Sequence, residues 1–176
     1  MCGIIGFTGN LQAPGILVDG LQQLEYRGYD SAGIAVNNGS ETKIVKTTGK
    51  VATLREKVEA TADLAGTCGI GHTRWATHGG VTEVNAHPHV SGNVTLIHNG
   101  IIENYKELAA SLKTKGFTAI SETDTEVAAM LIDSLYDGDP FAALKEADKA
   151  LEGAYGFCVM SVSYTHLRAH ETRRHL

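Results

Sequence analysis

Few features of this chain suggest a membrane, an export route or a disulfide scaffold. None of its apolar stretches approaches the roughly 20 residues that a membrane-spanning helix needs. Its start lacks the basic segment and long hydrophobic run of a secretory signal. The three cysteines, Cys2, Cys68 and Cys158, are an odd number and lie far apart, unlike a disulfide framework. We therefore expect the protein in a reducing cytoplasm.

Proline is also scarce, with three residues against 20 glycines in a chain of 176. Because the glycines separate apolar segments, they predict many tight turns instead of a disordered linker. The net charge of −5 argues against nucleic acid or an anionic membrane as partner. With 43% hydrophobic and 20% charged residues, the composition is that of one ordinary domain with a hydrophobic core.

Motifs for common cofactors are missing too. The chain has no GxxxxGK[ST] phosphate loop, and residues 66–71 lack the spacing of a dinucleotide fingerprint. No Cys-x-x-Cys or His-Glu-x-x-His spacing accompanies the five histidines between residues 72 and 98, which are His72, His78, His87, His89 and His98. We expect no cofactor and no metal, and keep a histidine-rich metal-binding or regulatory module as an alternative.

The apolar pattern predicts strands and helices that alternate in blocks. Strands are expected over residues 2–8, 32–36, 43–47, 67–73, 93–98 and 155–163, and helices over 14–26, 51–63, 102–115, 123–135 and 140–151. Asn38-Gly39 is a strong hairpin turn signal, and residues 74–92 read as a loop. The order predicts an α+β fold in layers, with antiparallel sheets.

The last residues break this pattern. The segment 163–176 is polar and basic and has no clear periodicity. We interpret it as an unrelated tail, attached where a further strand should follow, and leave it out of the predicted fold. The predicted domain therefore covers residues 2–162.

Cys2 is the first candidate for chemistry, because it directly follows Met1. If Met1 is removed, one residue carries both a thiol and a free α-amine, and the amine can take the proton of the thiol. The amine has an ordinary pKa of about 7.7–8.0, so a fraction is unprotonated at neutral pH. The alternative is a small buried residue on an N-terminal strand, since free cysteine is often buried.

Polar residues near predicted strand and helix ends are the other candidates. Arg74 offers a planar fork for a carboxylate, and Asn99 with the Gly100 N–H could donate to an oxyanion. Asp124 suits either a substrate ammonium or a helix cap. Each has an ordinary structural alternative: a surface arginine, a strand-to-helix turn and a capping residue. Trp75, Thr77 and His78 share the loop with Arg74 and could line a pocket.

Taken together, six segments resemble the glutaminase domain of the glutamine–fructose-6-phosphate aminotransferase family, which is also called glucosamine-6-phosphate synthase. The segments are Cys-Gly-Ile at 2–4, Glu-Tyr-Arg-Gly-Tyr-Asp-Ser-Ala-Gly at 25–33, His-Thr-Arg-Trp-Ala-Thr-His-Gly at 72–79, Asn-Ala-His-Pro-His at 85–89, His-Asn-Gly at 98–100 and Ser-Glu-Thr-Asp-Thr-Glu at 121–126. Other class-II amidotransferases share the first segment. The resemblance runs over residues 2 to about 162.

The resemblance implies an N-terminal-nucleophile hydrolase fold, an αββα sandwich of antiparallel sheets between helical layers. It implies that Cys2 attacks the side-chain amide of L-glutamine, that its own α-amine moves the proton, and that Asn99 and Gly100 hold the oxyanion. Arg27 would lie close to the nucleophile. The implied substrate-binding residues are Arg74 for the α-carboxylate, Asp124 for the α-ammonium, and Trp75, Thr77 and His78 around the pocket.

The resemblance also implies partners outside this chain. Family members continue into further strands and then into sugar-isomerase domains, which bind fructose 6-phosphate and use the ammonia, and they form homo-oligomers. We therefore expect a C-terminally truncated sandwich that carries the glutaminase half alone. An inactive truncated fragment remains a further alternative.

Overall fold

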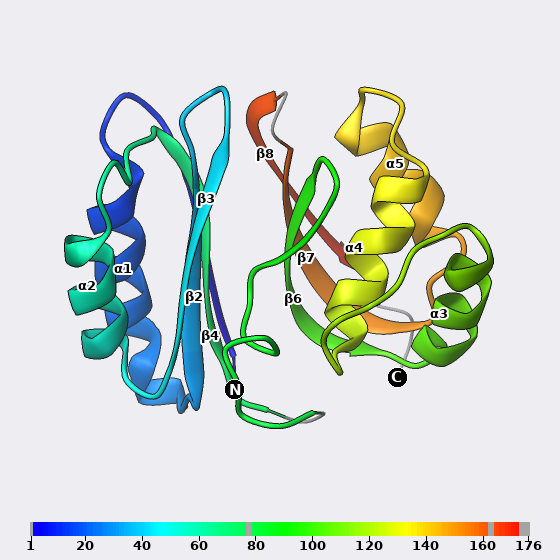
Figure 1. Cartoon of the computed structure of the whole chain (residues 1–176), viewed down its shortest axis with the longest axis horizontal. Coiled ribbons are helices and arrows are strands. Elements are labelled where there is room, and N and C mark those ends of the chain that lie inside the picture. The colour runs from blue at the N-terminus through cyan, green and yellow to red at the C-terminus, as the bar shows by residue number, and fades with distance from the viewer. Residues whose placement is uncertain (1, 77–78, 162–163, 173–176) are drawn as a thin grey trace.

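The computed structural model describes residues 2–76, 79–161 and 164–172, the last range by its backbone alone. Two antiparallel sheets of four strands lie face to face between two layers of helices (Figure 1). The first sheet has the strand order β1-β4-β2-β3, and the second has the order β5-β6-β7-β8. The predicted α+β sandwich with antiparallel sheets is confirmed.

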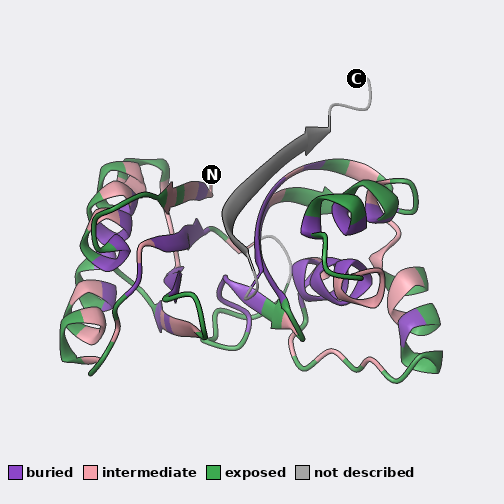
Figure 2. Ribbon diagram, turned by 90° about the horizontal axis from the view of Figure 1, so that it is seen from above, coloured by how far each residue is buried: buried purple, intermediate pink, exposed green. Residues whose placement is uncertain are grey.

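The first sheet is built from β1 (Gly3–Thr8), β2 (Ser31–Asn37), β3 (Thr42–Thr48) and β4 (Cys68–Arg74). Helices α1 (Ala13–Leu24) and α2 (Val51–Ala60) cover its outer face, and a short 3-10 helix, η1 (Glu25–Arg27), extends α1. Strand β2 is buried along its whole length, because helices cover one face of its sheet and the second sheet covers the other. Figure 2 shows buried residues on the strands and on the helices of both halves. Ile34 contacts the helical side, whereas the neighbouring Ala35 belongs to the core between the sheets.

The second sheet is built from β5 (His89–Ser91), β6 (Val94–Ile102), β7 (Gly153–Ser161) and β8 (Tyr164–Thr172). Helices α3 (Tyr105–Thr114), α4 (Asp124–Ser134) and α5 (Pro140–Asp148) lie on its outer face. Two buried cysteines, Cys68 on β4 and Cys158 on β7, belong to the core between the sheets. No helix within the described ranges has the length and apolarity to cross a bilayer.

Most predicted elements lie within a few residues of the observed ones, but three predictions need correction. The helix predicted from Ile102 begins at Tyr105, because Ile102 still pairs with Gly153 of β7. Ile102 packs in the same core as Leu112 of α3, which explains why it matched the helical spacing. The predicted loop 74–92 contains β5 near its end.

The third correction concerns the C-terminal segment. Residues 164–172 form β8, which pairs with β7, although the sequence pattern led us to leave them out of the fold. The interpretation of 163–176 as a tail unrelated to the domain stays a prediction.

Helix α4 begins after Thr123-Asp124-Thr125-Glu126, a sequence in which Thr123 and Glu126 could cap each other's backbone N–H groups. The Thr123 hydroxyl accepts a hydrogen bond from the Glu126 N–H at 3.3 Å. Glu126 does not complete a reciprocal capping box. Its carboxylate accepts from the N–H groups of Ile120 at 3.0 Å and Ser121 at 2.6 Å instead. Glu126 thus holds the segment that leads into the helix, which places Asp124 at its start.

Candidate functional site

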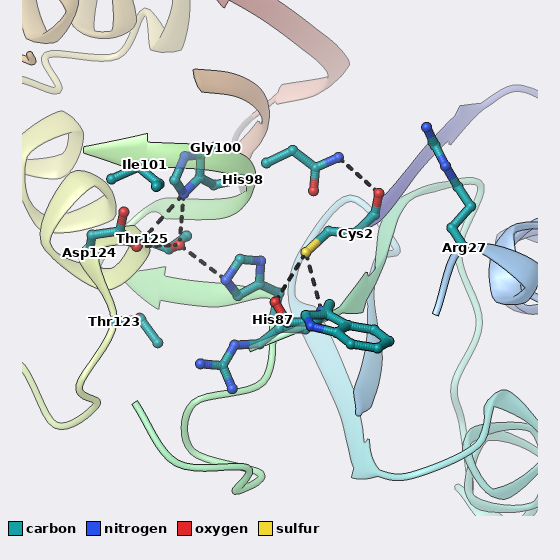
Figure 3. A pocket seen from close by; sticks show the side chains of 12 residues that line it. Cys2, Arg27, His87, His98, Gly100, Ile101, Thr123, Asp124 and Thr125 are labelled. Atoms are coloured by element: carbon teal, nitrogen blue, oxygen red, sulfur yellow. Dashed lines mark hydrogen bonds and ion pairs between the residues drawn. The ribbon is translucent and has the colours of Figure 1, made fainter. Parts of the chain in front are cut away.

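A cavity of about 580 Å³ lies where the two sheets and the start of α4 meet. Its lining comes from both halves of the sandwich (Figure 3). The lining residues are Cys2, Arg27, Arg74, Trp75, His87, His98, Asn99, Gly100, Ile101, Thr123, Asp124 and Thr125. The volume suits a small molecule of amino-acid size or somewhat larger.

Cys2 is held at this cavity by the packing of β1 against β4. Gly3 pairs with Thr73, and the Gly3 N–H donates to the Thr73 hydroxyl at 3.0 Å. A Cβ on Gly3 would lie 2.7 Å from that hydroxyl and 2.9 Å from Leu24, so a glycine is needed for this close approach. The Cys2 Sγ accepts from the Trp75 backbone N–H at 3.2 Å and remains partly exposed. It is therefore accessible from the cavity.

Asn99 and Gly100 face Cys2 from β6 in the other sheet. The Asn99 Nδ2 donates to the Cys2 carbonyl oxygen at 3.4 Å, and the Asn99 Oδ1 lies 2.9 Å from the His72 Nε2. Gly100 has φ +123°, and a Cβ there would lie 2.1 Å from the Ala154 carbonyl oxygen. This backbone conformation and close contact explain why a glycine follows Asn99 in the strand.

Groups of opposite charge line the same cavity. The Arg74 side chain is buried, with 5% of its surface exposed, and its Nη1 donates to the Gly80 carbonyl oxygen at 3.2 Å. Asp124 Oδ2 accepts from the Ile102 N–H at 2.9 Å. A guanidinium and a carboxylate in one cavity can bind the carboxylate and ammonium of an amino acid.

Trp75 and Arg27 lie near the nucleophile. The Trp75 ring is half-exposed and packs on Gly28, where a Cβ would lie 2.3 Å from the ring. Gly28 follows η1, and Arg27 lies on the side of Cys2 away from Asp124 (Figure 3). The 3-10 turn thus brings Arg27 to the cavity and makes room for the Trp75 ring.

Four histidines, His72, His87, His89 and His98, are buried at this side of the cavity, and His87 and His98 line it. The Thr125 hydroxyl bonds the His87 Nε2 at 3.0 Å and the His98 Nδ1 at 3.1 Å, and the Thr123 hydroxyl bonds the His89 Nε2 at 3.1 Å. Burial lowers the pKa of all four imidazoles, to about 3 for His72 and His89. The cluster is therefore neutral at pH 7.

This neutral cluster predicts a loss of stability in weak acid. The unfolded chain takes up protons at its histidines below about pH 6.5, whereas the folded chain does not until near pH 3 at His72 and His89. The unfolded state binds more protons in that window, so the free energy of unfolding falls as the pH falls. We expect His72 and His89 each to contribute a loss of about 1 kcal/mol between pH 7 and 5.5, measured by urea unfolding.

His89→Gln is the matched variant for this prediction. It removes one buried histidine, so the drop in the free energy of unfolding between pH 7 and 5.5 should be smaller by the contribution of His89. An unfolding free energy that stays constant over this interval in the unsubstituted chain would contradict the prediction.

The histidine cluster does not favour the metal-binding alternative. Across residues 2–76 and 79–161, no group of three or more histidine, cysteine or acidic side chains is placed to hold a metal ion. Ring nitrogens of His87, His89 and His98 bond to threonine hydroxyls instead. The cluster is thus a hydrogen-bonded support for the cavity wall.

Most of the residues that the sequence singled out lie together. Around the cavity the structure places Cys2, Arg27, Arg74, Trp75, Asn99, Gly100 and Asp124. Thr77 and His78 lie outside the described residues. The lining also includes residues that the sequence did not single out for catalysis or substrate binding: His87, His98, Ile101, Thr123 and Thr125. Four of them lie within the segments at 85–89, 98–100 and 121–126, and Ile101 directly follows Gly100, so these segments are the signal that could have found them.

Comparisons with known proteins agree with this geometry. Residues 72–171, more than half of the chain, match the family described as "Glutamine amidotransferase domain". The glutamine–fructose-6-phosphate aminotransferase (isomerizing) of Thermus thermophilus is 52% identical over 174 residues, which are 98% of this chain and 29% of that protein. The enzyme of the same name from Idiomarina loihiensis is 52% identical over 168 residues, 93% of this chain and 27% of its own length. The chain thus spans less than a third of these relatives.

Solved structures give the same fold. The glutamine phosphoribosylpyrophosphate amidotransferase of B. subtilis has a TM-score of 0.77 and 29% identity, covering 92% of this chain and 35% of that one. A structure described as the allosteric regulatory enzyme of purine biosynthesis also has a TM-score of 0.77, with 31% identity over 92% of this chain and 36% of its own. The predicted N-terminal-nucleophile hydrolase sandwich is confirmed.

Proposed function

The chain belongs to the glutamine amidotransferase domain family, and from this premise we propose that it hydrolyses L-glutamine to glutamate and ammonia, with Cys2 as nucleophile. The observation that carries the proposal is the convergence of Cys2, Asn99 and Gly100 on one cavity that also holds Arg74 and Asp124. A nucleophile, oxyanion donors and a pair of opposite charges are the groups that hydrolysis of an amino-acid side-chain amide requires.

Substrate binding in this proposal rests on charge. Arg74 pairs with the α-carboxylate of glutamine and Asp124 with its α-ammonium, so the side-chain amide points toward Cys2. We also assign Trp75, Thr77 and His78 to glutamine binding, as the resemblance implies, and Arg27 to a role beside the nucleophile. The burial of Arg74 supports this assignment, because little water competes with a substrate carboxylate for a buried guanidinium.

The proposed reaction begins once Met1 is removed. The α-amine of Cys2 takes the thiol proton, and the Sγ forms a bond to the amide carbon of glutamine. The Asn99 Nδ2 and the Gly100 N–H donate to the resulting oxyanion. The C–N bond then breaks as the α-ammonium returns the proton to nitrogen, which leaves as ammonia. Water attacks the thioester, loses a proton to the amine and releases glutamate, and the thiol is restored.

The use of the ammonia belongs to the same proposal. The relatives named above are isomerizing fructose-6-phosphate aminotransferases, so we assign this chain the ammonia-supplying half of glucosamine 6-phosphate synthesis. Its partners would be the sugar-isomerase domains of a longer, homo-oligomeric protein. A cytoplasmic location fits the three unpaired cysteines.

The proposal is tested by the state of the N-terminus. Intact-mass analysis identifies chains with and without Met1, and both are assayed for glutamate release. A third form, which lacks Met1 but has the Cys2 amine acetylated, isolates the role of the base. The blocked forms are the one that keeps Met1 and the acetylated one. We expect both blocked forms to lose about 10²-fold or more in kcat, because they lack the general base. Turnover at full rate with Met1 in place would contradict the base assignment.

A further inference from the structure

The Asn99 carboxamide must be held in one of two orientations. In one, the Nδ2 faces Cys2 and can donate to an oxyanion; in the other, the Oδ1 faces it and repels negative charge. The bond from Nδ2 to the Cys2 carbonyl oxygen is long, at 3.4 Å, whereas the Oδ1 lies 2.9 Å from the His72 Nε2. The shorter contact is the stronger constraint on the amide.

His72 can fill this role only as a hydrogen-bond donor. The Asn99 Oδ1 is an acceptor, so the proton in this contact belongs to the His72 Nε2. His72 is 0% exposed, and burial lowers its pKa to about 3, so the ring is neutral and carries a single N–H. No described group is in hydrogen-bond geometry with its Nδ1, although the His98 backbone is close enough to raise the pKa of the ring. The geometry therefore places the one N–H at Nε2.

The surroundings hold the ring itself in place. His72 lies on β4, whose neighbours in the sheet are β1 and β2. Its ring packs on His87, with 4.1 Å between ring centroids, and His87 is held by the Thr125 hydroxyl. A chain of contacts thus runs from Thr125 through His87 and His72 to Asn99. A flipped amide would place its N–H₂ against the His72 N–H.

We infer that His72 is a positioning residue, whose Nε2–H fixes the Asn99 carboxamide with its Nδ2 toward Cys2. The inference rests on the proposed function in one respect, the use of that Nδ2 for the oxyanion. His72 is not among the described residues that line the cavity, so its effect is transmitted through Asn99.

A double-mutant cycle tests this inference. His72→Gln keeps a donor near the Nε2 position, whereas His72→Asn keeps an amide only near Nδ1. We expect His72→Asn to lower kcat about 10- to 100-fold with little change in KM, since a misplaced oxyanion donor costs up to about 10²–10³-fold. His72→Gln should recover most of this loss. In an Asn99→Ala background, His72→Asn should cost less than about threefold, because the residue it acts through is gone.

His89→Gln is the matched control, because it replaces another buried histidine that bonds to Thr123 and not to Asn99. The fold-loss in kcat caused by His89→Gln should be the same with Asn99 present and in the Asn99→Ala background. The inference is overturned if the His72→Asn and Asn99→Ala losses multiply, or if His72→Gln is no better than His72→Asn.

A measurement on the unsubstituted chain covers the case in which variants at this buried position fail to fold. Two-bond ¹H–¹⁵N spectra of histidine-labelled protein at pH 7 show which ring nitrogen carries the proton. The expected tautomer of His72 is Nε2–H, and an Nδ1–H tautomer overturns the inference. The tautomer does not depend on turnover. Absence of glutamate release from the Met1-free chain would instead contradict the proposed function.

Discussion

Replacing Cys2 with alanine is expected to lower glutamate release from glutamine by at least about 10³-fold, because the thiol that forms the proposed thioester is removed. Cys2 is the cysteine that lines the cavity. The fold should survive, since Cys2 lies before β1 and its side chain is not part of the hydrophobic core. Circular dichroism and the urea midpoint check the fold, and a coupled glutamate assay measures turnover.

Cys68→Ala is the control for this variant. Cys68 is also a free cysteine, but it is buried on β4 between the sheets, and burial raises the pKa of its thiol. Its replacement should lower stability modestly and leave turnover within about twofold, because a buried thiol of raised pKa is unreactive. If Cys2→Ala kept a tenth of the activity, Cys2 could not be the nucleophile.

The strands and helices near the site could be predicted because their signals are local. The hairpin of β2 and β3 follows from Asn38-Gly39 between two β-branched runs, and α4 follows from the capping hydroxyl of Thr123. The end of β6 could not be predicted in this way. Ile102 and Leu112 share one core, so their spacing reads as helical although a strand ends between them.

The residues of the site also differ in whether a local signal identifies them. Arg74, Asn99 and Asp124 each carry a group whose chemistry suggests a role, and six sequence segments in the right order connected them. His72 and His87 also lie in these segments, but their side chains suggest no role on their own, because their importance depends on contacts made across the chain. His72 meets Asn99 on the opposite sheet, and His87 meets Thr125 at the start of α4. Such contacts exist only after both sheets have assembled.

Gly100 matters both for the fold and for the proposed oxyanion site. We expect Gly100→Ala to have the second large effect. The residue has φ +123°, which L side chains rarely adopt, and a Cβ would lie 2.1 Å from the Ala154 carbonyl oxygen of β7. Backbone strain and this overlap together should lower the free energy of unfolding by roughly 3 kcal/mol or more. Turnover should fall by about 10²-fold or more, because the Gly100 N–H would move from the oxyanion.

Gly39→Ala separates the two causes. Gly39 also has a positive φ, +97°, but a Cβ there would meet nothing within 4 Å. It lies in the β2–β3 turn and is not among the residues that line the cavity. Gly39→Ala should lower the free energy of unfolding only by the backbone strain, about 1 kcal/mol, and should leave turnover unchanged. Equal losses of stability in the two variants would mean that contact with Ala154 adds nothing. Normal turnover in folded Gly100→Ala would remove the Gly100 N–H from the proposed oxyanion site.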